Sequence, residues 1–258
     1  QKIENIKEVC SHPMALLQCK AFFKKHYLPN NAILTVAGNI ELEEIKALSK
    51  KWFENIPIGN VTVRNLPKEP KQTVENRLKV ERDVPTNAIY KAYKMCNKQH
   101  PDYYATDLLS DVLSLGKSSR FHTSLIKEQK LFSEISAFIS GSFDEGLFTV
   151  TGKISEHVSF EKAEEAILLE LKKIKNELVN TDELTKVKNK IESTSEFSET
   201  SVLNKAMNLS FAELLGDANT VNLEVENYQK VSSEDLKRVA NEILIEANCS
   251  TLIYAKKK

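Results

Sequence analysis

The chain has few of the residues that build cross-linked or flexible proteins. Its 258 residues include only 4 cysteines, 7 glycines and 7 prolines. No two cysteines form a C-x-x-C pair, and cysteines this sparse do not make a disulfide scaffold. A single bridge between Cys10 and Cys19 stays open, because sequence spacing alone does not decide it. The scarcity of glycine and proline argues against long flexible linkers.

An excess of one charge and long apolar runs are also missing. The chain carries 36 lysines and arginines and 36 aspartates and glutamates, so its net charge is zero. This balance argues against a nucleic-acid partner, which selects for a basic stripe. The apolar runs are far shorter than the roughly 20 residues that span a bilayer, so no transmembrane segment is expected. The start of the chain lacks the apolar core of a signal peptide. Any targeting signal would lie upstream of Gln1, so the compartment is unknown.

The N-terminal part reads as an incomplete set of elements. Helical periodicity covers residues 13–27, and the branched apolar run at 32–37 predicts a buried strand. Asn39 is a plausible N-cap for a second amphipathic helix that begins near Leu42. A helix, a strand and a helix are too few for a domain, because each element needs a covering layer. Residues 1–57 are therefore expected to end a domain that begins upstream.

The rest of the chain is predicted to form one domain after a linker. Prolines and a glycine cluster in the predicted linker, residues 58–72. Alternating apolar residues then predict strands at about 73–82, 87–95, 132–142, 146–154 and 250–255. Helical periodicity predicts helices that begin near residues 101, 118, 159, 181 and 232. Thr181 is expected to cap one of them, and Ser232 with Asp235 to form a capping box on the last. The mixture predicts an α+β domain over 73–258, with an antiparallel or mixed sheet covered by helices.

The two ends of the chain resemble each other weakly. A helix followed by a strand at 13–37 parallels a helix followed by a strand at 232–255. Asn31 and Asn248 stand just before the two strands. Two tandem copies of one domain, the first cut at its start, would give this pattern. Helix–strand units recur in many α/β proteins, so the pattern alone does not decide.

Local motifs offer no metal or phosphate site. The segment 116–118 (GKS) lacks the first glycine of a phosphate-binding loop, because Asp111 stands there, and is better explained as a helix end. The segment 153–157 (KISEH) has a lysine in place of the first histidine of H-x-x-E-H. The set Cys10, His12, Cys19 and His26 fits no standard structural zinc spacing. No metal site is expected in this chain.

Five pieces of the chain, in order, resemble the pitrilysin/insulinase family of zinc peptidases. They are HYLPNNA, VAGNI, PDYYATDLL, GKSSR and TDELTKVKN. The family includes the mitochondrial processing peptidase and its bacterial relatives. Its zinc motif, H-x-x-E-H, does not occur in the 258 residues.

The resemblance implies a domain plan. Residues 1–57 resemble the last helices and strand of the family's first domain, and residues 73–258 resemble its second domain. In that family two homologous α+β domains face each other across a chamber, and the first domain binds the zinc. No cofactor is therefore expected in this chain. The zinc is expected in the full-length protein or in a partner.

The resemblance also implies candidate site residues. The stretch from Asp107 to Asp111 corresponds to the zinc motif and resembles a degenerate copy that shapes the chamber. Active members supply an arginine and a tyrosine from the second domain to hold the scissile carbonyl. Arg120 and Lys127 are the candidates for the cation, and Phe132 lies near the place of the tyrosine without its hydroxyl. These three are expected to bind substrate, and no catalytic residue is expected.

Three functional hypotheses follow. The first is the C-terminal, substrate-chamber portion of a zinc metalloendopeptidase that cleaves peptides or unfolded protein segments, inactive alone and partnered by an upstream zinc-bearing domain. The second is a non-catalytic scaffold subunit that pairs with a separate, homologous zinc-bearing chain. The third is an unrelated α+β binding module. Whether the chain is itself an enzyme is thus left open by the sequence.

Overall fold

The computed structural model describes residues 12–60, 67, 69–141 and 143–257. These residues form two compact units. The first combines the described residues up to Glu69 with Glu199–Val221, and the second combines Pro70–Ser198 with the described residues from Asn222 onward. None of the helices in the described ranges is both long and apolar enough to cross a membrane.

The second unit contains a mixed five-stranded sheet. The strands are β1 (Asn76–Arg82), β2 (Ala88–Met95), β3 (Phe132–Ser140), β4 (Gly146–Ile154) and β5 (Cys249–Lys256). Their order is β1-β5-β2-β4-β3, with β1 parallel to β5 and the other neighbours antiparallel. The α+β class and the mixed sheet expected from the sequence are confirmed.

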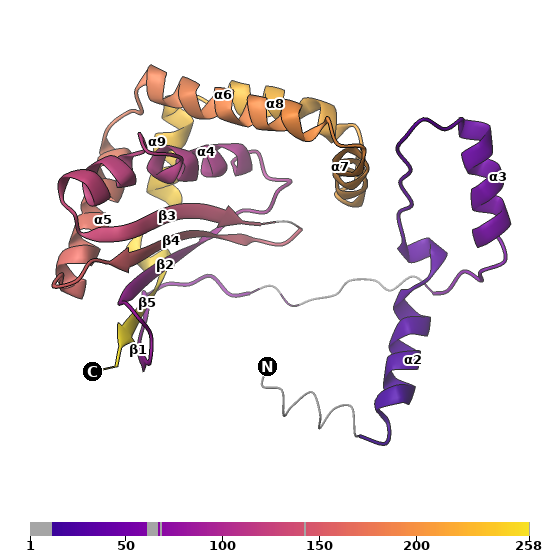
Figure 1. Cartoon of the computed structure of the whole chain (residues 1–258), viewed down its shortest axis with the longest axis horizontal. Helices are drawn as coiled ribbons and strands as arrows, with labels where there is room; N and C mark the ends of the chain where they lie inside the picture. The colour runs from indigo at the N-terminus through magenta and orange to yellow at the C-terminus, as the bar shows by residue number, and fades with distance from the viewer. Residues whose placement is uncertain (1–11, 61–66, 68, 142, 258) are drawn as a thin grey trace. The chain divides into compact units, whose positions relative to one another are not determined.

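Helices cover one face of this sheet (Figure 1). They are α4 (Tyr103–Ser114), η2 (His122–Glu128), α5 (Phe160–Asn176), α6 (Thr181–Ser198), α8 (Thr220–Lys230) and α9 (Ser233–Ile243). The strands alternate accordingly: in β5, Cys249, Thr251 and Ile253 are buried toward the helices, whereas the residues between them are half-buried. The core therefore lies between the sheet and α4, α5 and α9.

The last helix shows how local sequence sets this packing. Ser232 and Asp235 form the predicted capping box, with the Asp235 amide donating to Ser232 Oγ at 3.1 Å and the Ser232 amide donating to Asp235 Oδ2 at 3.0 Å. Leu236, Val239 and Ala240 then recur at helical spacing and are fully buried. The capping box thus sets where α9 begins, and the apolar residues set which side of the helix faces the sheet.

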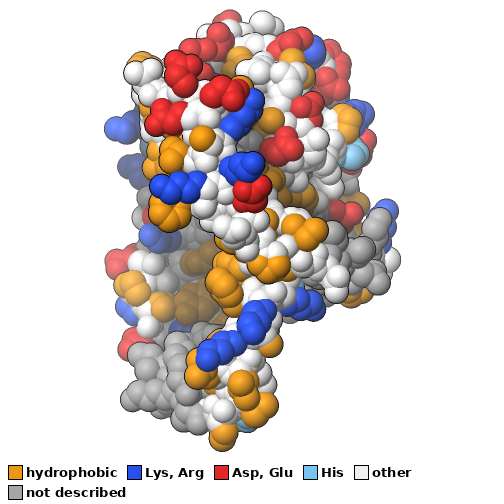
Figure 2. All heavy atoms as spheres, turned by 90° about the vertical axis from the view of Figure 1, so that its right-hand side faces the viewer, with side chains coloured by type: hydrophobic (Ala, Val, Ile, Leu, Met, Phe, Trp, Pro, Cys, Tyr) orange, Lys and Arg blue, Asp and Glu red, His pale blue; other side chains and the backbone are white. Residues whose placement is uncertain are grey.

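The first unit has no core of this kind. It contains α2 (Ala15–His26), the short 3-10 helix η1 (Pro29–Asn31), α3 (Leu42–Phe53) and α7 (Val202–Leu214). None of residues 12–60 is buried. Large hydrophobic side chains stand at its surface, as the orange groups among the charged ones in Figure 2 show. These helices are amphipathic, yet their apolar faces have no covering layer within the described residues.

Three sequence predictions differ from the structure. Residues 32–37 are not assigned as a strand, because no other described strand pairs with them. Asn39 does not cap α3, which begins after Glu41 without a side-chain cap. Thr181 is the first residue of α6 rather than its cap, and the side chain of Asn180 accepts a hydrogen bond from the Asp182 amide at 2.9 Å. The division into 1–57, 58–72 and 73–258 stays a prediction, and much of 58–72 lies outside the described residues.

Candidate functional site

The helix that the resemblance predicts to correspond to the zinc motif carries two carboxylates, one turn apart. Asp107 and Asp111 lie on α4, and Asp107 Oδ2 accepts a hydrogen bond from the Tyr228 hydroxyl at 2.6 Å. Burial raises the pKa of the Asp107 carboxyl despite this hydrogen bond. Burial, together with the neighbouring charge of Asp107, raises the pKa of the Asp111 carboxyl to about 7. The pair therefore resists carrying two negative charges at neutral pH.

These residues do not fit a catalytic zinc ion. Such an ion takes three protein ligands, with imidazole nitrogen prominent among them. The described part of the chain brings no three His, Cys, Asp or Glu side chains together in a metal-binding geometry. One of the two α4 carboxylates is also engaged by Tyr228. We therefore assign no metal-dependent step to this helix.

Tyr228, whose hydroxyl donates to Asp107, belongs to a cluster of aromatic rings. The rings of Tyr104 and Tyr228 meet edge to face, with centroids 4.9 Å apart, and Tyr103 meets Tyr104 in the same way at 5.9 Å. Asn227 Nδ2 donates to the Tyr104 hydroxyl at 3.2 Å. Burial and the Asp107 charge raise the pKa of Tyr228, so its hydroxyl stays protonated as a donor. The cluster packs α8 onto α4.

Arg120, one of the three predicted substrate-binding residues, lies just before η2. Its guanidinium makes a bidentate pair with Glu183 of α6, with Nε donating to Oε1 at 2.9 Å and Nη2 to Oε2 at 2.7 Å. The hydrogen bonds that Arg120 donates to Glu183 raise the pKa of Arg120. The pair ties this segment to α6. A substrate contact by Arg120 stays a prediction.

Lys127 lies in a π-helix. The helix η2 is of this rare type, which often marks functional sites. Its inner side is fixed by Ser124, whose hydroxyl donates to the buried Glu170 of α5 at 2.7 Å and accepts from Gln129 Nε2 at 2.9 Å. Lys127 itself is exposed in the last turn. Its role in substrate binding also stays a prediction.

Phe132 begins β3 and is a core residue. Its side chain is 2% exposed. The ring lies over Gly152 of β4 so closely that a Cβ there would stand 2.6 Å from Phe132 Cε1. The ring therefore requires glycine at position 152. A contact of Phe132 with substrate stays a prediction.

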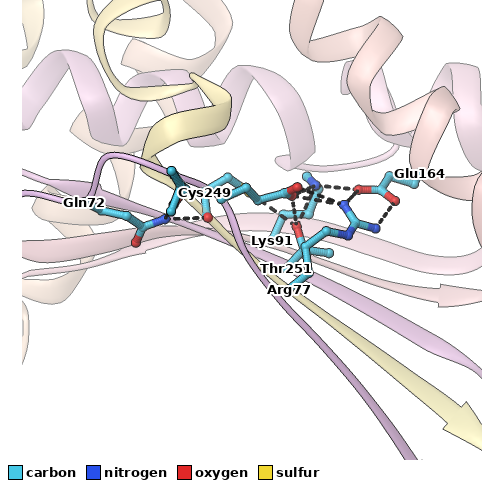
Figure 3. A network of polar contacts seen from close by, with 8 residues as sticks. Gln72, Arg77, Lys91, Glu164, Cys249 and Thr251 are labelled. Carbon is cyan, nitrogen blue, oxygen red and sulfur yellow. Dashed lines mark hydrogen bonds and ion pairs between the residues drawn. The ribbon is translucent and has the colours of Figure 1, made fainter.

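The sequence analysis missed a buried cluster of charges beside β1 (Figure 3). Lys91 of β2 is 2% exposed, and its ammonium donates to Thr251 Oγ1 and to Glu164 Oε1, each at 2.7 Å. It also lies 3.4 Å from Glu75 Oε1. Arg77 makes a bidentate pair with Glu164 at 2.9 and 2.8 Å and contacts Glu75 at 3.0 Å. Two cations thus neutralise two carboxylates.

The cluster shifts the acidity of both carboxyls. Hydrogen bonds from Arg77 and Lys91 lower the pKa of Glu164 to about 2. At Glu75, burial raises the pKa, but hydrogen bonds from Thr251 and Arg77 outweigh it, so the pKa is lowered overall. The sequence did contain a signal for this cluster. In the alternating strand β2, Lys91 falls on the same face as the buried Ile89 and Tyr93.

The charge cluster forms one end of a cavity of about 880 Å³ between α5 and the sheet. Its other walls are partly apolar, with Tyr93 and Cys249 on the strands and Leu168 and Leu171 on α5. The ammonium, guanidinium and carboxylate groups at its end already bond one another. The charges at this end of the cavity therefore neutralise one another.

The weaker sequence motifs have structural explanations. Gly116 has φ 78° just after α4 ends, as expected of a helix-terminating glycine. Lys153 lies on β4 and pairs with Glu134 at 2.7 Å, so the segment 153–157 is no metal-binding helix. Cys10 lies outside the described residues.

The family profile described as the peptidase M16 inactive domain matches residues 16–191. This match covers most of the chain, and the chain belongs to that family. The resemblance to zinc peptidases of this type, drawn from five short pieces of sequence, is thereby confirmed.

Individual relatives support the assignment. The chain is 31% identical over 165 residues to the zinc protease PqqE of Helicobacter pylori, which covers 62% of this chain and 37% of that protein. The crystal structure of a protease from Helicobacter pylori matches 93% of this chain and 59% of that one, with 26% identity and a TM-score of 0.86. A peptidase M16 inactive domain from Pseudomonas fluorescens shares the fold, with 18% identity, a TM-score of 0.80 and coverage of 96% and 58%. The chain thus spans well under two thirds of the curated relative that it matches.

Proposed function

We propose that this chain is the non-catalytic, substrate-chamber part of a zinc-dependent metalloendopeptidase that cleaves peptides or unfolded protein segments. One observation carries the proposal. The chain belongs to the inactive-domain family, and its counterpart of the zinc helix holds aspartates, one of them bonded to Tyr228. In this proposal the domain keeps the fold of the family and carries Asp107 and Asp111 where a catalytic domain would carry its zinc ligands.

The uncovered face of the sheet is the surface that we assign to substrate. Helices cover the opposite face (Figure 1). Tyr90, Phe138 and Leu147 point to the uncovered side, since each alternates with buried neighbours, and each is more than a third exposed. On β4, Thr149 lies beside Phe138 and Thr151 lies beside Tyr90. Such a surface offers apolar contacts and hydroxyls to an extended peptide of varied sequence.

Zinc and its ligands belong to another part of the protease in this proposal. The Helicobacter pylori relative is named a zinc protease and is longer than the part that matches. A zinc-bearing domain would supply the metal and the water-activating group, while this chain would supply the facing wall. The peptide substrate would lie between them.

A scaffold subunit paired with a separate zinc-bearing chain is the second candidate. The observation that favours it is that two of the residues predicted to bind the scissile carbonyl already have other roles in the fold. Phe132 is a core residue without a hydroxyl, and Arg120 is already paired with Glu183. A chamber wall without these donors would hold substrate without assisting the reaction.

The assignment of substrate to this surface is tested by placing a positive charge on it in the whole protease. Phe138→Arg and Leu147→Arg should raise KM for an unfolded protein substrate several-fold and leave kcat for a short peptide unchanged. Leu178→Arg, at a residue 51% exposed outside the sheet, is the matched control. Unchanged KM in both sheet variants would contradict the assignment of this face.

A further inference from the structure

Two cations stand side by side on the uncovered face of the sheet, where β1 and β5 end. The uncovered face is the side opposite the helices of the second unit (Figure 1). On β5, Leu252, Tyr254 and Lys256 point to this side, because they alternate with buried residues. The parallel register places Arg82, the last residue of β1, beside Lys256. The guanidinium and the ammonium therefore leave the sheet on the same face.

Arg82 and Lys256 form a like-charge pair that the fold does not need. Both side chains are exposed, and the two residues are register partners of neighbouring strands. Like charges directly opposite each other destabilise a sheet, whereas opposite charges stabilise it. A carboxylate at either position would therefore make this end of the sheet more stable. The pair calls for an explanation other than folding.

Other cations of the same sheet have carboxylate partners. On the covered face, both cations of the buried charge cluster are paired. On the uncovered face, Lys153 Nζ lies 2.7 Å from Glu134 Oε2. By contrast, no carboxylate among the described residues pairs with Arg82 or Lys256, and the Arg82 guanidinium donates to the Glu81 carbonyl at 2.9 Å. The pair can therefore receive a carboxylate from another molecule.

Hydrogen bonds hold the backbone beneath both cations. The Lys256 amide donates to Asn87 Oδ1 at 2.8 Å, and the Lys257 amide donates to the Arg82 carbonyl at 2.8 Å. Pairing of β1 with β5 thus continues to the end of the described chain. Neighbouring strands lie about 4.8 Å apart, so two long cationic side chains that start from them can meet at one carboxylate.

Apolar side chains continue from the cation pair along the same face. Tyr254 lies beside Val80, and Leu252 lies beside Leu78, in the next two rows of the β1–β5 pairing. Leu78 is 60% exposed. An extended peptide turns every second side chain to the same side, which is also the spacing of these rows. A peptide laid along β1 and β5 would therefore meet the cations with one group and the apolar rows with alternate side chains.

We propose that Arg82 and Lys256 bind a carboxylate of the peptide substrate, and that the two apolar rows bind side chains two and four residues away from it. The substrate class is an extended peptide that combines an acidic group with apolar residues at alternate positions. The acidic group is an Asp or Glu side chain or the C-terminal carboxylate. The inference rests on the function proposed above and names the substrate of the same sheet face.

Three labelled peptides test the need for a carboxylate. All alternate leucine with polar residues: one has a glutamate and blocked ends, one has glutamine in its place, and one has glutamine and a free C-terminal carboxylate. Fluorescence anisotropy measures their binding to the whole protease in the presence of a chelator, so that no cleavage occurs. At least one carboxylate peptide should bind about three- to tenfold more tightly than the blocked glutamine peptide, as one or two partly exposed ion pairs would give.

The pattern of affinities identifies the source of the carboxylate. Tighter binding of the glutamate peptide assigns the pair to an acidic side chain, and tighter binding of the free-ended peptide assigns it to the C-terminus. Either preference should shrink in high salt, because exposed charges are screened. Equal affinities of all three peptides at low salt would overturn the proposal. Binding of anionic phospholipid vesicles through the same pair, without a preference among the peptides, would also overturn it.

Variants of the whole protease show where the carboxylate binds. Arg82→Gln combined with Lys256→Gln should abolish the preference and leave binding of the blocked glutamine peptide unchanged. Its thermal midpoint should be at least that of the wild type, because a repulsive pair is removed, so unfolding would not explain the loss. Lys79→Gln, on the other face of β1, is the matched control and should keep the preference. A preference that survives in the double variant, or an equal loss in the control, would overturn the proposal.

Cleavage separates this inference from the proposed function. With zinc restored, zinc-dependent cleavage of the three peptides with the same kcat/KM and the same affinity would overturn the carboxylate site and leave the function standing. A carboxylate preference in binding, without zinc-dependent cleavage of any peptide or unfolded protein, would support the carboxylate site and overturn the function.

Discussion

The buried charge cluster beside β1 gives the sharpest stability prediction. Replacing Lys91 by methionine keeps the unbranched apolar stem of the side chain and removes its ammonium group. Glu75, Glu164 and the Thr251 hydroxyl then lose a donor that lies within 2.7 to 3.4 Å. Arg77 remains and neutralises one of the two carboxylates, so one half-buried negative charge is left without compensation.

The size of the effect follows from known cases. Removing one partner of a buried ion pair costs about 3 to 5 kcal/mol. Because the guanidinium of Arg77 stays in place, we expect the lower end, about 3 kcal/mol. In a unit of this size that corresponds to a fall in the midpoint of thermal unfolding of roughly 6 to 12 °C. Thermal and urea unfolding followed by circular dichroism measure it.

Two variants decide whether the reasoning is correct. Lys79→Met removes a lysine from strand β1 of the same sheet, where the side chain is 62% exposed, and should change stability by less than about 0.5 kcal/mol. Glu164→Gln combined with Lys91→Met should recover part of the loss, because the uncompensated charge is removed as well. Wild-type stability in Lys91→Met, or equal losses in the two lysine variants, would refute the account of the cluster.

Three more predictions concern single side chains. Tyr228→Phe should destabilise the second unit by about 1 to 2 kcal/mol and raise the pKa of Asp107 further, as seen by nuclear magnetic resonance titration; an unchanged titration would count against the bond. Asp111 has a folded pKa of about 7, above its ordinary 3.8, so wild-type stability should fall as the pH rises between these values. Asp111→Asn removes that loss, and its gain in melting temperature should be larger at pH 8 than at pH 5; equal gains would contradict the shift. Glu164 has a folded pKa of about 2, so its stabilisation is present above its ordinary 4.5 and lost as the pH falls toward 2. Acid unfolding of Glu164→Gln should therefore show a shallower pH dependence, and a slope equal to that of the wild type would argue against the pairing.

Much of the fold follows from local patterns. The strands of the second unit lie close to their predicted ranges, because alternation identifies a half-buried strand without help from its partners. The capping box at Ser232 gave the start of α9 for a similar reason, since both of its hydrogen bonds are local. The sequence predicted a helix near η2 but not its π-helical form, and the side-chain contact of Ser124 with Glu170 joins residues that are distant in sequence.

The candidate site was predicted only in part. The correspondence of Asp107 and Asp111 to the zinc motif came from resemblance, but the hydroxyl of Tyr228 that engages Asp107 lies far along the chain. The partners of Lys91 likewise come from α5, β5 and the segment before β1, so no local pattern names them. The segment 32–37 illustrates the opposite case. Its sequence predicts a strand, and its strand partners are not among the described residues.

Zinc-dependent cleavage of a fluorogenic peptide tests the central claim most directly, with this chain assayed alone and together with the zinc-bearing domain. The account predicts no cleavage above background by the chain alone, even in excess zinc, and cleavage that a chelator abolishes when both parts are present. Chelator-sensitive cleavage by the chain alone would contradict it.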